Sequence, residues 1–484
     1  MSIFFVKNLK LPTVCTILGL LSLMFVELDR RAYNSDFYNS SSGTIEIIKS
    51  TSLSKEFIII GHGFAGSKEM MRQIAYDVTK AGSNAVLFDF IGHGSNQQKL
   101  VNEPTEITGT TQQLVTQLSN IINFIYEKFG DEINISLIGH SMASDIVVRA
   151  SADKRIKSVV AISPYSTGIT QDFPKDLLLI SGQFESHLRS HALQMVEAFK
   201  PEAKENTEYT NGKIRRKASF IENTGHVSVI YAPQTTKIII DWLKLENYHR
   251  PIWKNQIIWI LIGITFIVIG MSRVNTNLAN ETISVLNNKK ALISVPLATA
   301  SSLSSGLIEI NLLPIHGFER IAIYFGLVGL FAYLFSFNYR ITSLKIDLLY
   351  WLKLILCFGI LCFLINRYIG SFSLSGNRIT GFSTLILPVT LFSLVIEKLI
   401  ASSSIWIAIL LRGLPIIGFS MLLILFPEQY GLMFTTVLIY ILYFIVFGYI
   451  GRHQRKKIGH AKVGLAHGIF LSFSFAATQP IFAL

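Results

Sequence analysis

The chain has 484 residues, of which 50% are hydrophobic and only 15% are charged. Soluble globular domains carry about 25% charged residues, so this composition excludes an ordinary water-soluble protein and indicates a membrane protein. The formal net charge of +12 does not indicate a nucleic-acid-binding protein, because the cations lie mainly between apolar runs and form no basic stripe with interleaved aromatic residues. The partner predicted from composition is the lipid bilayer.

The first apolar run is Leu11–Val26, and Lys7 and Lys10 precede it. About 20 apolar residues can cross a bilayer as a helix, because every backbone polar group then pairs within the segment. No cleavage site of small residues follows the run, so residues 1–30 are predicted to be an uncleaved signal anchor rather than a cleaved signal peptide.

Residues 45–247 have the composition of a soluble domain, in which short apolar runs alternate with helix-like segments. This alternation predicts an α/β domain with a mostly parallel sheet covered by helices on both faces. The predicted strands are 56–60, 85–90, 133–138, 158–162, 177–180 and 218–221, and the predicted helices are 70–80, 110–129, 142–153 and 233–243.

Beyond Trp253 the chain becomes a series of apolar runs with short polar breaks, which predicts an all-α polytopic membrane domain over 254–484. The weakest run is rich in Ser and Thr and contains Glu309. About eight spans are predicted, over 254–272, 291–312, 319–336, 347–366, 380–397, 404–426, 432–450 and 463–482.

Cations in alternate loops predict an orientation for these spans, because cytoplasmic loops carry an excess of Lys and Arg. The cation-rich loops contain Lys289, Lys290, Arg340, Lys345, Lys398, Arg452, Arg455, Lys456, Lys457 and Lys462. The rule therefore predicts a multi-pass plasma-membrane protein with residues 45–247 on the extracytoplasmic side. The loop that holds Arg367 and Arg378 is an exception to the alternation.

Arg412 lies inside an apolar run, where a charge is costly and often marks a functional cavity. The alternative is an arginine that snorkels towards the membrane surface, or pairs with a carboxylate such as Glu397 or Glu309, near a Gly/Pro kink. All three cysteines, Cys15, Cys357 and Cys362, lie in apolar runs, so the soluble region has neither a disulfide framework nor thiolate metal ligands.

The segment Ile138–Ala143 has the pattern of a nucleophile elbow, in which a serine follows a strand and precedes a helix. A serine alcohol is a weak nucleophile, so it must be held on a sharp turn within reach of a base. Gly139 and Ala143 are small enough to let the strand and the helix pass closely at that turn.

Four motifs in residues 45–247 together resemble the α/β-hydrolase superfamily. They are His62-Gly63-Phe64, Asp89-x-x-Gly92-His93-Gly94-Ser95, Gly139-His140-Ser141-Met142-Ala143 and Gly225-His226. Ala143 departs from the glycine that is usual there, and the short segment between Pro164 and Lys175 leaves little room for the helical cap of many relatives.

The resemblance implies that Ser141 is a nucleophile, His226 its base and Glu185 the acid that orients the histidine, in the chain order of the family. Asp172 is the alternative acid. The resemblance also implies that the backbone N–H groups of Phe64 and Met142 stabilise an oxyanion.

The remaining histidines of these motifs, His62, His93 and His140, fit turn-stabilising hydrogen bonds better than metal ligation, and no metal or cofactor is predicted. The run Arg215-Arg216-Lys217 is interpreted as a solvated loop that is able to contact anionic headgroups.

The first functional hypothesis is a membrane-anchored serine hydrolase that cleaves an ester, thioester or amide of a small or amphiphilic acyl substrate. An acyltransferase with the same triad is the second. The third is a transporter or scaffold whose outer domain binds a ligand without catalysis.

Overall fold

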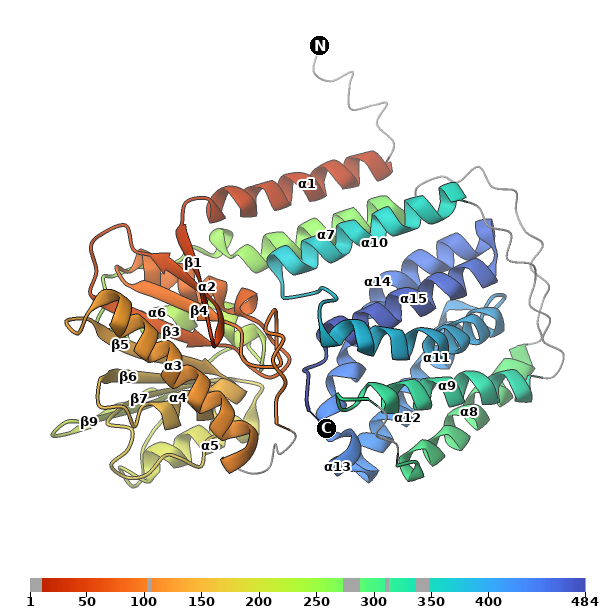
Figure 1. Ribbon diagram of the computed structural model, residues 1–484. Helices are drawn as coiled ribbons and strands as arrows, with labels where there is room; N and C mark the ends of the chain where they lie inside the picture. The colour runs from red at the N-terminus through yellow and green to blue at the C-terminus, as the bar shows by residue number, and fades with distance from the viewer. Residues whose placement is uncertain (1–10, 102–106, 273–287, 310–312, 337–347, 484) are drawn as a thin grey trace, which may run out of the picture. The chain divides into compact units, whose positions relative to one another are not determined.

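The computed structural model describes residues 11–101, 107–272, 288–309, 313–336 and 348–483. The chain forms two compact units. The first, which we call the sheet unit, holds Ser22–Leu261 and Arg367–Ser371. The second, the helical unit, comprises Met1–Leu21, Ile262–Asn366 and Phe372–Leu484. Figure 1 labels the helices and strands of both units.

Among the described residues the sheet unit contains a nine-stranded sheet in the order β1-β2-β4-β3-β5-β6-β7-β9-β8. The strands from β4 to β9 in this order run parallel, and antiparallel pairs lie at both edges. The strands are β1 (Asn34–Ser40), β2 (Gly43–Lys49), β3 (Glu56–Gly61), β4 (Asn84–Phe88), β5 (Asn134–His140), β6 (Ile156–Ile162), β7 (Asp176–Gly182), β8 (Glu208–Asn211) and β9 (Ile214–Ile221).

Helices cover both faces of this sheet, which is why its central strands are apolar along their whole length. On one face, Ile58 and Ile60 of β3 pack in a buried cluster with α2 and α6, and α3 and α4 cover the other face (Figure 1). The helices are α2 (Lys68–Lys80), α3 (Gln112–Phe129), α4 (Met142–Ala150), α5 (Ser186–Glu197) and α6 (Pro233–Leu243). The predicted α/β architecture with a mostly parallel sheet is confirmed.

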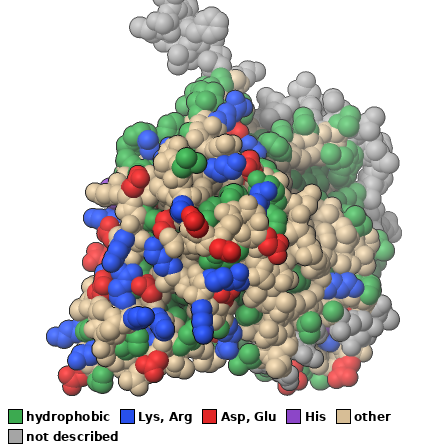
Figure 2. Space-filling model, turned by 60° about the vertical axis from the view of Figure 1, so that its left-hand side comes forward, with side chains coloured by type: hydrophobic (Ala, Val, Ile, Leu, Met, Phe, Trp, Pro, Cys, Tyr) green, Lys and Arg blue, Asp and Glu red, His purple; other side chains and the backbone are tan. Residues whose placement is uncertain are grey.

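The cationic run at 215–217 is not a loop, so that interpretation is wrong. These residues belong to β9, where Arg216 is fully buried and donates to the backbone oxygens of Thr170 and Pro174 at 2.6 and 3.2 Å. Arg215 pairs with Asp176 at 2.8 Å and stacks on the ring of Trp242. On the face shown in Figure 2, Lys and Arg side chains are interspersed with Asp and Glu.

The rest of the described chain is helical. Its helices are α1 (Leu11–Arg30), α7 (Gln256–Ser272), α8 (Asn288–Ser302), α9 (Phe318–Phe335), α10 (Leu348–Tyr368), α11 (Asn377–Leu399), α12 (Ile405–Leu425), α13 (Pro427–Tyr430), α14 (Thr435–Ile458) and α15 (His460–Thr478). Within the described ranges, six helices are long and apolar enough to cross a membrane: α1, α9, α11, α12, α14 and α15. The apolar stretches of α7 and α10 are shorter. The chain is thus suited to crossing a membrane several times.

Two boundaries of the helical unit differ from the predicted spans. The predicted span 291–312 is helical only to Ser302 in α8, after which a 3₁₀ turn covers Leu303–Leu307. Helix α14 continues past residue 450 to Ile458, so Arg452 and Arg455 belong to the helix rather than to a loop. Arg340 and Lys345, used for the predicted orientation, lie outside the described residues.

Aromatic rings pack within the core of the helical unit, where Phe325 of α9 contacts Phe392, Phe419 and Phe475. Small residues bring helices close together: a Cβ on Gly468 of α15 would lie only 2.4 Å from the Cα of Thr390 in α11. Such close approach is a common way for membrane helices to associate.

The two unusual arginines both find carboxylate partners. Arg412 pairs with Glu397 of α11, which is one of the two partners considered from the sequence. Arg367, the exception to the loop alternation, pairs with Glu27 at 2.6 Å within the sheet unit.

Candidate functional site

Ser141 lies on the sharp turn between β5 and α4. Its backbone has φ +54° and ψ −117°, a strained conformation for a residue other than glycine. Two hydrogen bonds hold the turn: the Ser141 N–H donates to the oxygen of Ile162 at 2.8 Å, and Ser144 N–H donates to the Ser141 oxygen at 2.8 Å. The strain is thus maintained by the strand beside it and by the helix after it.

Glycine is required at position 139 because this turn leaves no room for a side chain. A Cβ on Gly139 would lie 2.3 Å from the backbone oxygen of Ala143, a distance that real Cβ atoms do not adopt. Ala143 itself is fully buried, and a Cβ on Gly61 would lie 3.0 Å from the Ala143 Cβ. The alanine therefore fills the space that a glycine leaves empty, and the turn forms with it in place.

Three predicted residues come together at the carboxyl ends of three parallel strands. Ser141 follows β5, Glu185 follows β7, and His226 follows β9. The Oγ of Ser141 lies 2.9 Å from Nε2 of His226, whose Nδ1 lies 2.6 Å from Oε1 of Glu185. A carboxylate only accepts hydrogen bonds, so Nδ1 carries the proton and Nε2 accepts from the serine hydroxyl.

Glu185 is held in the charged form by its neighbours. Burial of the carboxyl opposes ionisation, but hydrogen bonds from His226, from the Gly182 N–H and from the Ser163 hydroxyl outweigh it, so the pKa of Glu185 lies below its ordinary value. The Gly182 N–H and the Ser163 hydroxyl donate to Oε2 at 2.6 and 2.9 Å, which leaves Oε1 for the histidine. The side chain of Glu185 is 5% exposed, whereas that of His226 is 45% exposed.

His140 supports the loop that carries His226. Its Nε2 lies 2.8 Å from the backbone oxygen of His226, which can only accept, so the imidazole of His140 donates there. Burial, aided by repulsion from the His226 imidazole, lowers the pKa of His140 to about 4. His140 is therefore neutral at physiological pH and acts as a fixed hydrogen-bond donor.

The low pKa of His140 predicts a stability loss in acid. Between an unfolded pKa of about 6.5 and a folded pKa of about 4, the unfolded chain binds the additional proton, so stability falls as pH falls through this window, by about 3 kcal/mol in all. We expect hydrogen-exchange protection of β5 and β7 in the full-length protein to fall from pH 7 to pH 4, and to fall less in His140→Gln. A His187→Gln variant, at an exposed position on α5, is the control. An unchanged pH dependence in His140→Gln would contradict the assignment.

The two backbone groups implied as oxyanion donors lie at the expected places in the chain. Met142 is the first residue of α4, where a backbone N–H has no partner within the helix. Phe64 lies in the loop after β3, and a Cβ on its neighbour Gly63 would lie 3.1 Å from the Ser141 Cβ, so this loop passes directly beside the serine.

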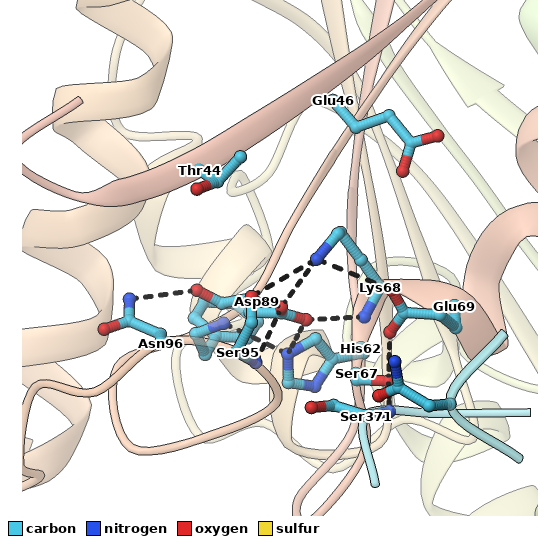
Figure 3. A network of polar contacts seen from close by, with 12 residues as sticks. Thr44, Glu46, His62, Ser67, Lys68, Glu69, Asp89, Ser95, Asn96 and Ser371 are labelled. Carbon is cyan, nitrogen blue, oxygen red and sulfur yellow. Dashed lines mark hydrogen bonds and ion pairs between the residues drawn. The ribbon is translucent and has the colours of Figure 1, made fainter. Parts of the chain in front are cut away.

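A buried polar network supports the loop that contains Phe64 (Figure 3). Asp89, at the end of β4, accepts from the Lys68 backbone N–H and from its ammonium group, both at 2.8 Å. It also accepts from Ser95 N–H and Oγ at 2.9 and 2.6 Å. His62 accepts from Phe90 N–H at 3.0 Å through Nε2 and donates through Nδ1 to Gly63 at 2.8 Å. Both ends of the loop are thereby attached to the end of β4.

The alternative acid, Asp172, is exposed between β6 and β7, and its electrostatic partner is Arg216 rather than His226. The histidines of the motifs contact backbone groups: His62 and His140 as given above, and His93 at the Ile91 oxygen, 2.9 Å away. Within the described part of the chain, no group of three or more His, Cys, Asp or Glu is arranged to hold a metal ion.

Ser163 is a site residue that sequence reasoning missed. It follows β6 with φ +50°, and its hydroxyl contacts Glu185. Its position directly after a buried strand, between the strands that carry Ser141 and Glu185, was the available signal. A lone serine after a strand is too common to be singled out without the sheet order.

A family model described as alpha/beta hydrolase fold matches residues 56–207. The chain carries an α/β-hydrolase domain. The match includes Ser141 and Glu185, and His226 lies beyond its end. Residues 163–175, which join β6 and β7 in this α/β-hydrolase domain, contain no helix.

The chain is similar to several solved structures, among them the following three. A putative α/β hydrolase from Agrobacterium tumefaciens is 16% identical, with a TM-score of 0.34, over 44% of this chain and 95% of that one. An α/β serine hydrolase without a lid from Xanthomonas campestris is 12% identical, with a TM-score of 0.33, over 44% and 94%. A membrane phospholipase A, described as a bacterial virulence factor, is 14% identical, with a TM-score of 0.33, over 47% and 92%. The comparison with curated proteins gives no match.

Proposed function

We propose that the α/β-hydrolase domain is a membrane-anchored serine hydrolase that cleaves an ester, thioester or amide through an acyl-enzyme. The observation that carries this proposal is the continuous hydrogen-bonded series Ser141–His226–Glu185, with distances of 2.9 and 2.6 Å. His226 removes the proton of Ser141 as its oxygen attacks the acyl carbon, and then returns that proton to the leaving group. In the second half, His226 activates a water molecule that releases the acid.

Glu185 stabilises the imidazolium that forms at each step, because its charge is buried and held by two further donors. The negative oxygen of the tetrahedral intermediate lies between the backbone N–H groups of Met142 and Phe64 in this mechanism. Both belong to rigidly held segments, one at a helix start and one attached to Asp89, so little reorganisation is needed as charge develops.

An amphiphilic acyl substrate is part of the proposal. Large apolar side chains next to the triad are exposed: Phe184, which precedes Glu185, is 70% exposed, and Val227, which follows His226, is 48% exposed. Tyr165, near the start of the connection between β6 and β7, is 63% exposed. Exposed apolar side chains next in sequence to Glu185 and His226 favour a substrate with an apolar acyl group.

The proposal predicts covalent labelling at Ser141. The full-length protein in detergent is treated with a fluorescent fluorophosphonate, which phosphonylates an activated serine with loss of fluoride. We expect labelling of the wild type, none of Ser141→Ala or His226→Ala, and undiminished labelling of the control His187→Ala, which removes an exposed histidine from α5. A folded wild type that is not labelled would overturn the catalytic proposal and favour a ligand-binding domain.

A further inference from the structure

A pocket of about 370 Å³ lies between α12 and α14 of the helical unit. This volume is within the range of about 300–1,000 Å³ that is usual for small-molecule sites. Most of its lining is apolar, and the exceptions include three arginines: Arg412, Arg452 and Arg455. Three guanidinium groups on one mainly apolar pocket are a feature that the proposed hydrolysis does not use.

The positive charge of this pocket is only partly compensated. Glu397, which is buried, pairs with Arg412 and lies 3.4 Å from Nη1 of Arg455. Throughout the described ranges, no carboxylate lies within ion-pair distance of Arg452, and Nε of the buried Arg412 has no hydrogen-bond partner. Arg412 and Arg455 thus share one carboxylate, and among the described residues none balances Arg452. Uncompensated charge among apolar helices is costly, so an anion that enters the pocket gains from all three.

Two of the three cations lie at one end of the pocket. Arg452 and Arg455 are in the last two turns of α14, and Ile405 begins α12 at the same end. Arg412 lies about 10 Å further along α12, at 1.5 Å per residue. Beyond it, the lining continues through Ile416 and Ile441. A ligand that matches this lining has an anionic head and an apolar chain.

We propose that this pocket binds an anionic phospholipid of the bilayer, with its phosphate on Arg412 and Arg452 and one acyl chain between α12 and α14. Phosphate accepts paired hydrogen bonds from the planar guanidinium group, which suits arginine better than lysine. Arg452 and Arg455 lie in the last two turns of α14, and Arg412 lies about a third of the way along α12. Basic pockets between membrane helices suit anionic lipid heads.

The lining offers a variant that closes the pocket without displacing a neighbour. Gly413 lines the pocket, and a Cβ built on it meets no atom within 4 Å. Gly413→Leu therefore occupies the space that the acyl chain would take. Gly359 of α10 also has nothing within 4 Å of an added Cβ and is not among the pocket residues, so Gly359→Leu is a matched control. Arg452→Gln removes a cation and leaves the volume intact.

The test is retention of phosphatidylglycerol by the full-length protein, measured by native mass spectrometry from detergent micelles, with phosphatidylcholine and oleate as comparison probes. We expect wild type and Gly359→Leu to retain one phosphatidylglycerol. We expect Gly413→Leu and Arg452→Gln to bind it at least about tenfold more weakly. Gel-filtration and circular-dichroism profiles that match the wild type show that the variants are folded.

Three results would overturn the proposal. Undiminished phosphatidylglycerol binding by folded Gly413→Leu would place the lipid elsewhere. Equal retention of phosphatidylcholine would show that the arginines do not select an anion. Retention of oleate in preference to phosphatidylglycerol would make a fatty carboxylate, not a phospholipid, the occupant.

Discussion

Replacing Glu185 with glutamine is expected to lower kcat for acyl ester hydrolysis by about 10³- to 10⁴-fold, with little effect on the fold. The reason lies in the two donors on Oε2. Because the Gly182 N–H and the Ser163 hydroxyl both point at that position, at 2.6 and 2.9 Å, the amide oxygen of a glutamine takes it and the NH₂ group faces His226. Nδ1 of His226 then has to accept, so its proton moves to Nε2.

With the proton on Nε2, His226 cannot remove the proton of Ser141, and the loss falls on kcat rather than on substrate binding. The measurement is steady-state hydrolysis of a short-chain and a long-chain p-nitrophenyl ester by the full-length protein. Asp172→Asn is the control, because the other acid considered from the sequence is exposed and interacts with Arg216. A loss in Asp172→Asn comparable to that in Glu185→Gln would contradict the assignment of the acid.

The central fold and the triad were predictable because their signals are local. Strands β3 and β5 are short apolar runs, and Gly139 and Ala143 lie within two residues of Ser141 in the sequence. Once the strands are in order, the parallel sheet brings the residues after β5, β7 and β9 to one edge. Glu185 and His226 were chosen through the resemblance to the α/β-hydrolases, and Asp172 remained the alternative acid.

Other features depended on contacts that are distant in the sequence. Arg216 resembles a surface cation in the sequence. Its guanidinium donates to the backbone oxygens of Thr170 and Pro174, more than 40 residues away, and no neighbouring residue indicates these contacts. Strand β1, Asn34–Ser40, is polar and lies at the sheet edge, so it lacks the apolar alternation by which strands are recognised. The donor role of His140 can be recognised only in the structure, because its acceptor, the backbone oxygen of His226, is 86 residues away in the chain.

The buried ion pair of Lys68 and Asp89 holds the loop that contains Phe64, and this role can be tested by mutation. Lys68 and Asp89 have side chains that are 9% and 3% exposed, and their charged atoms lie 2.8 Å apart. Burial opposes ionisation of Asp89, but the Lys68 charge and the donors around the carboxylate outweigh it, so the pKa of Asp89 is well below its ordinary value. A carboxylate left there without its cation is expected to be strongly destabilising.

Lys68→Met is accordingly expected to destabilise the α/β-hydrolase domain by about 3–5 kcal/mol at neutral pH, measured as lost hydrogen-exchange protection of β3 and β4 in the full-length protein. Asp89 stabilises the wild type above its unfolded pKa, and that contribution disappears as pH falls through the folded pKa, so the difference in stability between variant and wild type narrows in acid.

The double variant Lys68→Met/Asp89→Asn, which removes both charges, should recover much of the lost stability. Lys55→Met breaks a pair whose side chains are 66% and 86% exposed, and should change protection little. If Lys55→Met and Lys68→Met lose the same hydrogen-exchange protection, burial does not strengthen the Lys68–Asp89 pair. The network in Figure 3 would then not hold the loop of Phe64 through its charges.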